Sequence, residues 1–189
     1  KREGTVPQVP IYLPGVGTGK GATFVDRMVD KAGGGAFGWG MDARLQAAYR
    51  LIAERYEPEN RLFLFGFSRG AYTARSFIGF IRHAGILDVA RAKAIDKAIG
   101  IYRRAPAGQT GEESGQAIRF RLLHCRSVCV SEKDREARVR LFPALSETER
   151  ACFPHGYDPA RLGIIDFRYL GVFETVRALG MPGFVPGAR

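Results

Sequence analysis

The sequence lacks any long hydrophobic run. Its longest apolar stretches, residues 62–67 and 76–81, fall far short of the roughly 20 residues that a membrane-spanning helix requires. The first residues also lack the apolar stretch of a secretory signal. We therefore expect a protein that is cytoplasmic in the producing cell or leaves it without a signal peptide, unless a leader lies outside this sequence.

Cysteine and histidine are scarce, with three residues of each type. An odd number of cysteines excludes a full disulfide framework and favours a reducing compartment. Cys125, Cys129 and Cys152 have His124 and His155 nearby in the sequence, but the pattern lacks the second ligand pair of a typical zinc site. We expect structural thiols, no bound metal and no cofactor.

Acidic residues are outnumbered. The 29 Lys and Arg residues against 19 Asp and Glu give a formal net charge of +10. This excess is spread along the chain, and no aromatic-plus-basic motif of nucleic-acid recognition accompanies it. A diffuse positive charge attracts anionic surfaces in a salt-dependent way. We therefore do not expect nucleic acid as a partner, and we favour an anionic membrane or phospholipid surface.

The segments that are present follow the order of an α/β domain. With 189 residues, 46% of them hydrophobic, the chain has the size and composition of one globular domain. Residues 9–13 predict a short buried strand, and Asp42 is placed to begin a helix. The continuous apolar run at 62–65 predicts a parallel strand covered on both faces. A helix over 69–83, ended by Gly85, completes an alternation that indicates an α/β fold with a parallel sheet.

Residues 104–163 have a different composition. They open with a glycine-rich loop and continue with arginine-rich segments, in which Ser131 and Ser146 predict helix starts. A further helix, beginning at Asp88, precedes them. We interpret 104–163 as an insertion or cap over the core, which resumes with a predicted strand at 164–173.

The sharpest motif is a Gly-x-Ser-x-Gly pentapeptide that contains Gly66, Ser68 and Gly70. In a nucleophile elbow, the serine stands on a tight strand-to-helix turn, where small neighbours let the backbone pass closely. The turn also brings main-chain N–H groups near a developing oxyanion, so Arg69 would donate from its backbone. The alternative is a glycine-rich turn with a capping serine. The apolar strand before the motif and the helix after it favour the elbow.

Residues 66–75, Gly-Phe-Ser-Arg-Gly-Ala-Tyr-Thr-Ala-Arg, resemble the signature of an uncharacterised α/β-hydrolase domain family that includes the phospholipase effectors of bacterial type VI secretion. Residues 12–18, 38–41 and 170–180 resemble further segments of that family in the same order. The resemblance implies an α/β-hydrolase-like, mainly parallel sheet with helices on both faces and an inserted cap segment. It also implies a serine ester hydrolase, lipase or phospholipase-like, with Ser68 as the nucleophile and an ester or phospholipid as substrate.

The resemblance further implies a triad, in which a histidine takes the serine proton and an acid orients the histidine. Glu174 stands at the acidic position of the family, with Phe173 where tryptophan is usual. Serine hydrolases of this class can use aspartate or glutamate, so Glu174 is the expected acid. Asp158 and Asp166 are weaker substitutes.

The histidine of the triad is missing from its expected place, because none follows Glu174. We interpret His83, His124 and His155 as structural or surface residues. Residues 1–189 are therefore expected to form a single but incomplete α/β-hydrolase domain. The missing histidine leaves a second hypothesis, a catalytically degenerate hydrolase-fold domain that acts as a binding or adaptor module.

The glycine-rich loop at 14–21 superficially resembles a phosphate-binding loop. Its glycine spacing is wrong for that motif, and Gly21 occupies the position of the magnesium-binding Ser or Thr. Under the hydrolase hypothesis, Gly15, Gly17 and Thr18 instead lie at the same carboxyl edge of the sheet as Ser68, where open α/β folds bind ligands.

Overall fold

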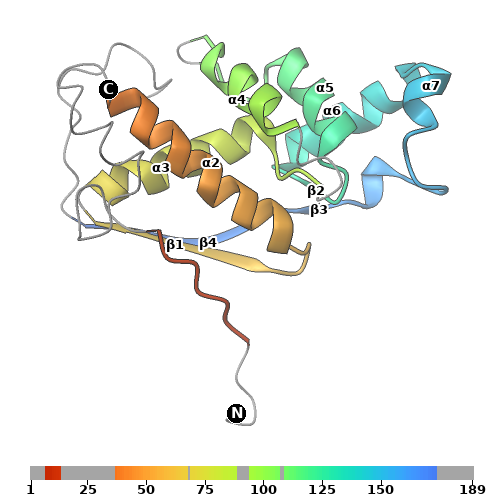
Figure 1. Ribbon diagram of the computed structural model, residues 1–189. Helices are drawn as coiled ribbons and strands as arrows, with labels where there is room; N and C mark the ends of the chain where they lie inside the picture. The colour runs from red at the N-terminus through yellow and green to blue at the C-terminus, as the bar shows by residue number, and fades with distance from the viewer. Residues whose placement is uncertain (1–6, 14–36, 68, 89–93, 107–108, 174–189) are drawn as a thin grey trace.

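The structure is a computed structural model that describes residues 7–13, 37–67, 69–88, 94–106 and 109–173, with the backbone alone for residues 37–44 and 69. Within these ranges, helices pack against two short parallel sheets (Figure 1), which confirms the predicted α/β class. The α-helices are α2 (Phe37–Arg55), α3 (Arg69–Ala84), α4 (Ile95–Arg103), α5 (Gly115–His124), α6 (Glu132–Leu141) and α7 (Glu147–Arg150). The strands are β1 (Arg61–Phe67), β2 (Val128–Cys129), β3 (Gly163–Ile164) and β4 (Asp166–Phe173), and two 3₁₀ turns are η2 (Phe142–Ala144) and η3 (Pro159–Arg161).

Strands β1 and β4 form the larger sheet, and they run in parallel. Their register begins with Arg61 opposite Asp166 and, after an irregularity at Leu62, ends with Phe67 opposite Phe173. The two strands therefore end level with each other at the carboxyl edge of the sheet.

Helices α2 and α3 cover one face of this sheet and build the hydrophobic core with it (Figure 1). Leu64 of β1 packs against the core from the sheet. Tyr49 of α2 is fully buried, with its ring 4.7 Å from that of Phe80 of α3 in an edge-on arrangement. Its hydroxyl donates to the Gly85 carbonyl at 2.9 Å and accepts from the Leu87 N–H at 3.2 Å. Tyr49 thereby joins α2 to the chain that leaves α3.

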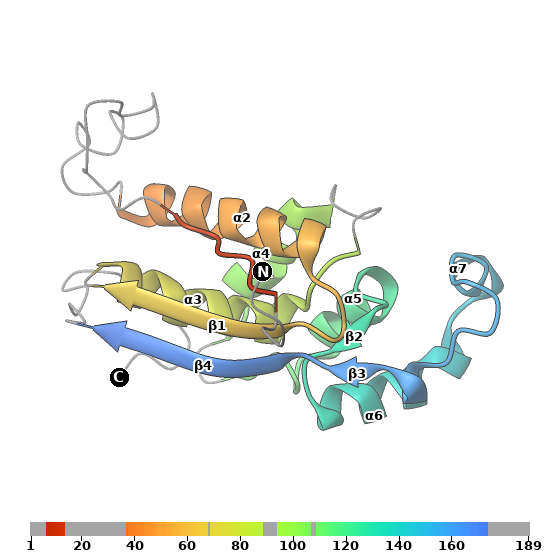
Figure 2. The same cartoon turned by 90° about the horizontal axis from the view of Figure 1, so that it is seen from below.

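The opposite face of the β1–β4 sheet carries a row of aromatic side chains. Each is between 52% and 66% exposed: Phe63, Phe65, Phe67, Tyr169 and Phe173. Gly171 makes room for this row, because a Cβ there would lie 2.8 Å from the Phe65 ring. Among the described residues, no helix lies over β1 and β4 on this side (Figure 2). Helices on the second face therefore stay a prediction.

Residues from α5 to η3 gather at the C-terminal end of α3, away from the carboxyl edge of the sheet (Figure 1). The two serines predicted to start helices here do so. The Ser131 hydroxyl accepts from the Asp134 N–H at 3.2 Å, and Ser146 forms a reciprocal capping box with Glu149. The short strands β2 and β3 pair in parallel and lead the chain into β4. None of the helices in the described ranges is long and apolar enough to cross a bilayer.

The strand predicted at 9–13 is wrong. Residues 7–13 form no strand, and Val9 and Tyr12 are 72% and 83% exposed. Pro7 and Pro10 remove two backbone donors from this segment, so it is poorly suited to a ladder of hydrogen bonds. A short apolar run alone did not define a strand here.

The helix start predicted at Asp42 is wrong, whereas the predicted end of α3 is confirmed. Helix α2 already begins at Phe37, so Asp42 lies within it. The helix predicted from Asp88 is present over Ile95–Arg103 as α4, and residues 89–93, on which its start depends, lie outside the described residues. The Asp88 carboxylate accepts hydrogen bonds from the Arg126 backbone and the Ser127 hydroxyl. Asp residues favour helix starts through the same acceptor capacity that a loop can use. Helix α3 ends one residue before Gly85, which has the expected positive φ of 74°.

The open aromatic face predicts self-association that a single substitution weakens. Large exposed apolar patches on soluble chains favour association, so we expect Phe65→Ser to lower the concentration-dependent sedimentation of the 189-residue chain. Its ring is exposed, so the free energy of unfolding should change by no more than about 0.5 kcal/mol. Leu64→Ser is the matched control on the covered face. We expect it to lower the free energy of unfolding by ~2 kcal/mol or more and to leave self-association unchanged. The reverse pattern of the two variants would contradict the assignment of the faces.

Candidate active site at the carboxyl edge of the sheet

Several residues singled out in the sequence lie outside the described residues. They are Ser68, Glu174, Gly15, Gly17 and Thr18. The structure does describe Gly66, Gly70 and the backbone of Arg69. The described part of the candidate site therefore consists of the strand ends and the helix start that border the predicted nucleophile and acid.

The connection between β1 and α3 is as short as an elbow requires. Strand β1 ends at Phe67 and helix α3 begins at Arg69, which leaves one residue between them. Gly66 is buried under the first turn of the helix: a Cβ on it would stand 2.4 Å from the Gly70 carbonyl oxygen and 2.6 Å from the Ala71 Cα. Only a residue without a side chain permits this approach of strand and helix.

The start of α3 supplies the electrostatics that the elbow needs. Arg69 is the first residue of the helix, and the first N–H groups of any helix have no partner within it. These donors and the positive end of the helix dipole favour negative charge at this position. Gly70 differs from Gly66, because a Cβ there would meet no described atom within 4 Å.

The register of the sheet relates the two predicted site residues. Phe67 and Phe173 are partners in the last pair of the β1–β4 ladder, and Ser68 and Glu174 are the next positions in the sequence. Because both strands run in the same direction, both chains leave the sheet at its carboxyl edge. Sequence reasoning did not predict that β1 and β4 are neighbours in the sheet.

The substitute acids lie elsewhere. Asp166 begins β4, opposite Arg61, about 23 Å from Phe173 at 3.3 Å per residue. Its carboxylate is 3.8 Å from the Arg61 Nε and 3.1 Å from the Arg168 Nε. Asp158 caps η3 by accepting from the Ala160 N–H at 2.9 Å. Neither carboxylate is available at the carboxyl edge.

All three histidines also lie away from this edge. His83 is buried in the last turn of α3, about 21 Å along the helix from Arg69, with its ring 5.3 Å from that of Tyr102. His124 ends α5 and packs against Phe120 at 4.7 Å between ring centroids. His155 is exposed in the turn after α7, and α7 lies at the end of the molecule far from the carboxyl edge of the β1–β4 sheet (Figure 1).

The cysteines do not form a metal centre with these histidines. Cys125 and Cys129 are buried, and burial raises the pKa of the Cys125 thiol to about 12 and that of Cys129 to about 11. Both thiols are therefore protonated at neutral pH. In the described ranges, no cluster of three or more His, Cys, Asp or Glu side chains converges on one point.

The close contact at Gly66 predicts a sharp difference between the two glycines of the motif. In Gly66→Ala, the new Cβ meets helix backbone, so we expect the free energy of unfolding to fall by ~1–3 kcal/mol or more. Gly70→Ala is the matched control, expected to be neutral or stabilising by up to about 1 kcal/mol because alanine favours a helix over glycine. Urea unfolding of both variants measures the difference. Equal destabilisation of the two would contradict the described turn.

Comparison with known proteins identifies the family of this chain. A family model described as "T6SS, Phospholipase effector Tle1-like, catalytic domain" matches residues 1–187. The uncharacterised protein YEL023C of Saccharomyces cerevisiae is 34% identical over 68 residues, which cover 36% of this chain and 10% of that protein. No solved structure matches the chain. Because the family model covers almost the whole sequence, the chain belongs to the Tle1-like catalytic domain family of type VI secretion phospholipase effectors.

Proposed function

We propose that this chain is the catalytic part of a serine ester hydrolase of the α/β-hydrolase type, with Ser68 as nucleophile and Glu174 as the triad acid. The observation that carries the proposal is the last register pair, Phe67 opposite Phe173, together with the one-residue turn between β1 and α3. This pair supports a common edge for the two residues that follow. The contact at Gly66 supports an elbow over an ordinary capped turn.

In the proposed reaction, the Ser68 hydroxyl oxygen attacks the carbonyl carbon of an ester while a histidine takes its proton. The negative charge that develops on the carbonyl oxygen is stabilised by the Arg69 N–H, at the positive end of α3. The alcohol leaves with the proton from the histidine, and water then hydrolyses the acyl-serine to a carboxylic acid. Glu174 orients the histidine in both steps.

The histidine is the part that this chain does not supply near the site. His83 sits at the opposite end of α3, and His124 and His155 belong to the segment gathered there. We therefore propose that the proton acceptor is contributed from outside residues 1–189, and that the 189-residue chain alone has little or no turnover. The same observation favours the second candidate function, a degenerate hydrolase fold that binds its ligand without cleaving it.

A lipid ester is the substrate class that the family indicates, because the family is one of phospholipases. We propose a phospholipid in particular. The net charge of +10 supports attraction to an anionic membrane surface, with strength that falls as salt is added. Membership in a family of type VI effectors further supports a protein that is made in the cytoplasm and exported without a signal peptide.

Fluorophosphonate labelling with added imidazole tests both the nucleophile and the missing base. A fluorophosphonate reacts covalently with an activated serine, and free imidazole can replace an absent histidine as proton acceptor. We expect slow labelling of the 189-residue chain that imidazole accelerates at least tenfold, with the label on Ser68. Ser68→Ala should abolish it, whereas Ser127→Ala, at an exposed serine beside Asp88, should not.

Two outcomes would count against the enzyme. A folded chain that stays unlabelled with and without imidazole would exclude Ser68 as an activated nucleophile and favour the binding module. Labelling that persists in Ser68→Ala would place the reactive group elsewhere. Release of fatty acid from phospholipid vesicles by a longer form that carries the histidine then tests the substrate.

A further inference from the structure

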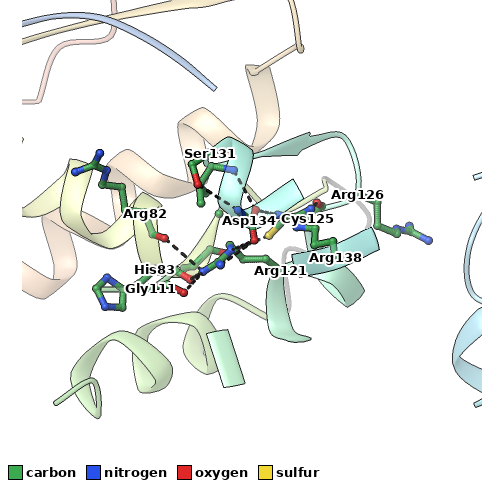
Figure 3. Close-up of polar contacts among 12 residues, drawn as sticks. Arg82, His83, Gly111, Arg121, Cys125, Arg126, Ser131, Asp134 and Arg138 are labelled. Atoms are coloured by element: carbon green, nitrogen blue, oxygen red, sulfur yellow. Dashed lines mark hydrogen bonds and ion pairs between the residues drawn. The ribbon is translucent and has the colours of Figure 1, made fainter. Parts of the chain in front are cut away.

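The C-terminal end of α3 is held by groups from outside the helix (Figure 3). The last carbonyls of a helix have no partner within it. Here the His83 carbonyl accepts from the Arg121 guanidinium at 2.7 Å, and the same nitrogen lies 3.4 Å from the Arg82 carbonyl. The Cys125 thiol donates to the Ala84 carbonyl at 3.1 Å, and the Gly85 N–H donates to the Ile81 carbonyl at 2.7 Å. The end of this helix is therefore fully occupied.

Arg121 is itself fixed by a buried network. Its Nε donates to Asp134 Oδ1 at 2.9 Å, and Arg138 Nη2 lies 2.8 Å from Asp134 Oδ2. The three side chains are all 0% exposed. Arg121 also donates to the Gly111 carbonyl at 3.0 Å, and Arg138 donates to the Cys125 carbonyl at 2.7 Å. The network thus binds α3, α5, α6 and the loop before α5 to one another.

The net charge of this buried network is favourable at the C-terminal end of α3. Burial raises the pKa of Asp134, but the guanidinium groups of Arg138 and Arg121 outweigh it and hold that pKa below its ordinary value. Asp134 is therefore ionised at neutral pH, and the network carries one net positive charge. That charge stands against the negative end of the α3 dipole. Arg121 is a charged cap on this helix.

Stability alone does not account for such a network. Burying three charges costs much of what their attraction returns, and apolar side chains of similar volume often do as well or better. What ionic and hydrogen-bonded groups add is geometry, because a planar guanidinium fixes its partners in distance and direction. The partners fixed here are the carbonyls at the end of α3.

The other end of the same helix forms the elbow. Helix α3 has 16 residues and spans about 24 Å, from the contact on Gly66 to the cap by Arg121. A helix held at both ends cannot slide or pivot on the strand. Without the cap, the C-terminal end of the helix would be held by its core packing alone.

We infer that Arg121, held by Asp134, is a positioning residue for the elbow. By fixing the C-terminal end of α3, it fixes the first turn of that helix, beside the position of Ser68, although the two ends lie about 24 Å apart. The catalytic part of this inference rests on the proposed function. The claim that Arg121 fixes the position of the first turn of α3 does not. Residues 104–163 then act as a support for the nucleophile helix from its far end.

Amide hydrogen exchange of the whole 189-residue chain tests this without requiring activity. In Arg121→Gln, we expect exchange at residues 70–75 to rise at least tenfold, together with the expected rise at residues 80–88. Arg121→Lys keeps the charge but has one nitrogen in place of the guanidinium fork, so it cannot reproduce the contacts of both Nε and Nη1 and should give a smaller rise at both ends. Leu145→Ala removes a buried side chain that is outside the core cluster to which the apolar residues of α3 belong, and should raise exchange near residues 142–150 only.

The inference is overturned if Arg121→Gln raises exchange at residues 80–88 while residues 70–75 keep the wild-type rate. It is also overturned if Leu145→Ala loosens residues 70–75 as much. Should Arg121→Gln fail to fold, the comparison of Arg121→Lys with the wild type decides in the same way. Fluorophosphonate labelling is a second readout: an unlabelled wild type would reject the proposed function and leave the exchange result valid. If labelling occurs, Arg121→Gln should slow it about tenfold more than Leu145→Ala.

Discussion

The arrangement of this molecule depends on how α3 is held at its two ends. At its first turn, the helix lies directly on Gly66, with no side chain between strand and helix. At its last turn, Arg121 donates to the His83 carbonyl, and Gly85 turns the chain away with a positive φ. Between these points, Phe80 and its apolar neighbours fill the core against α2 and β1. The core side chains and the contacts at the two ends together hold the helix against the sheet.

The carboxyl edge of the sheet is formed by two parallel strands that lie far apart in the sequence. Strand β1 leads into the Gly-x-Ser-x-Gly motif, and β4 follows about 100 residues later, yet Phe67 and Phe173 end level. A parallel pair needs a long connection, and here the connection contains the whole of residues 104–163. Parallel sheets are usually covered on both faces. The aromatic row on the second face of β1 and β4 therefore has the composition of a surface that is normally buried.

The sequence allowed prediction of features that depend on local signals. The tight turn at the motif, the end of α3 at Gly85 and the helix starts at Ser131 and Ser146 each need only neighbouring residues, and the structure agrees with all of them. The prediction of a strand at 9–13 was wrong, because a strand also needs a neighbouring strand with which to pair. The exposed aromatic row that includes Phe65 could not be predicted, because residues 62–65 are all apolar and show no alternation of polar and apolar side chains. The buried network was missed because arginine and aspartate are usually exposed, and only long-range packing made Arg121 an interior residue.

Residues 104–163 therefore do more than connect α4 to β4. Through Arg121 they hold the helix that follows position 68. Through β2 they also determine where β4 begins, because Cys129 pairs with Ile164 and the Cys129 carbonyl accepts from the Ile165 N–H at 2.9 Å. Asp166, the next residue, starts the ladder that ends at Phe173. One segment thus fixes both elements that carry the proposed nucleophile and acid, and it does so from the end of the molecule opposite the site. Within the described residues, this segment lies away from the carboxyl edge where the proposed nucleophile and acid would lie.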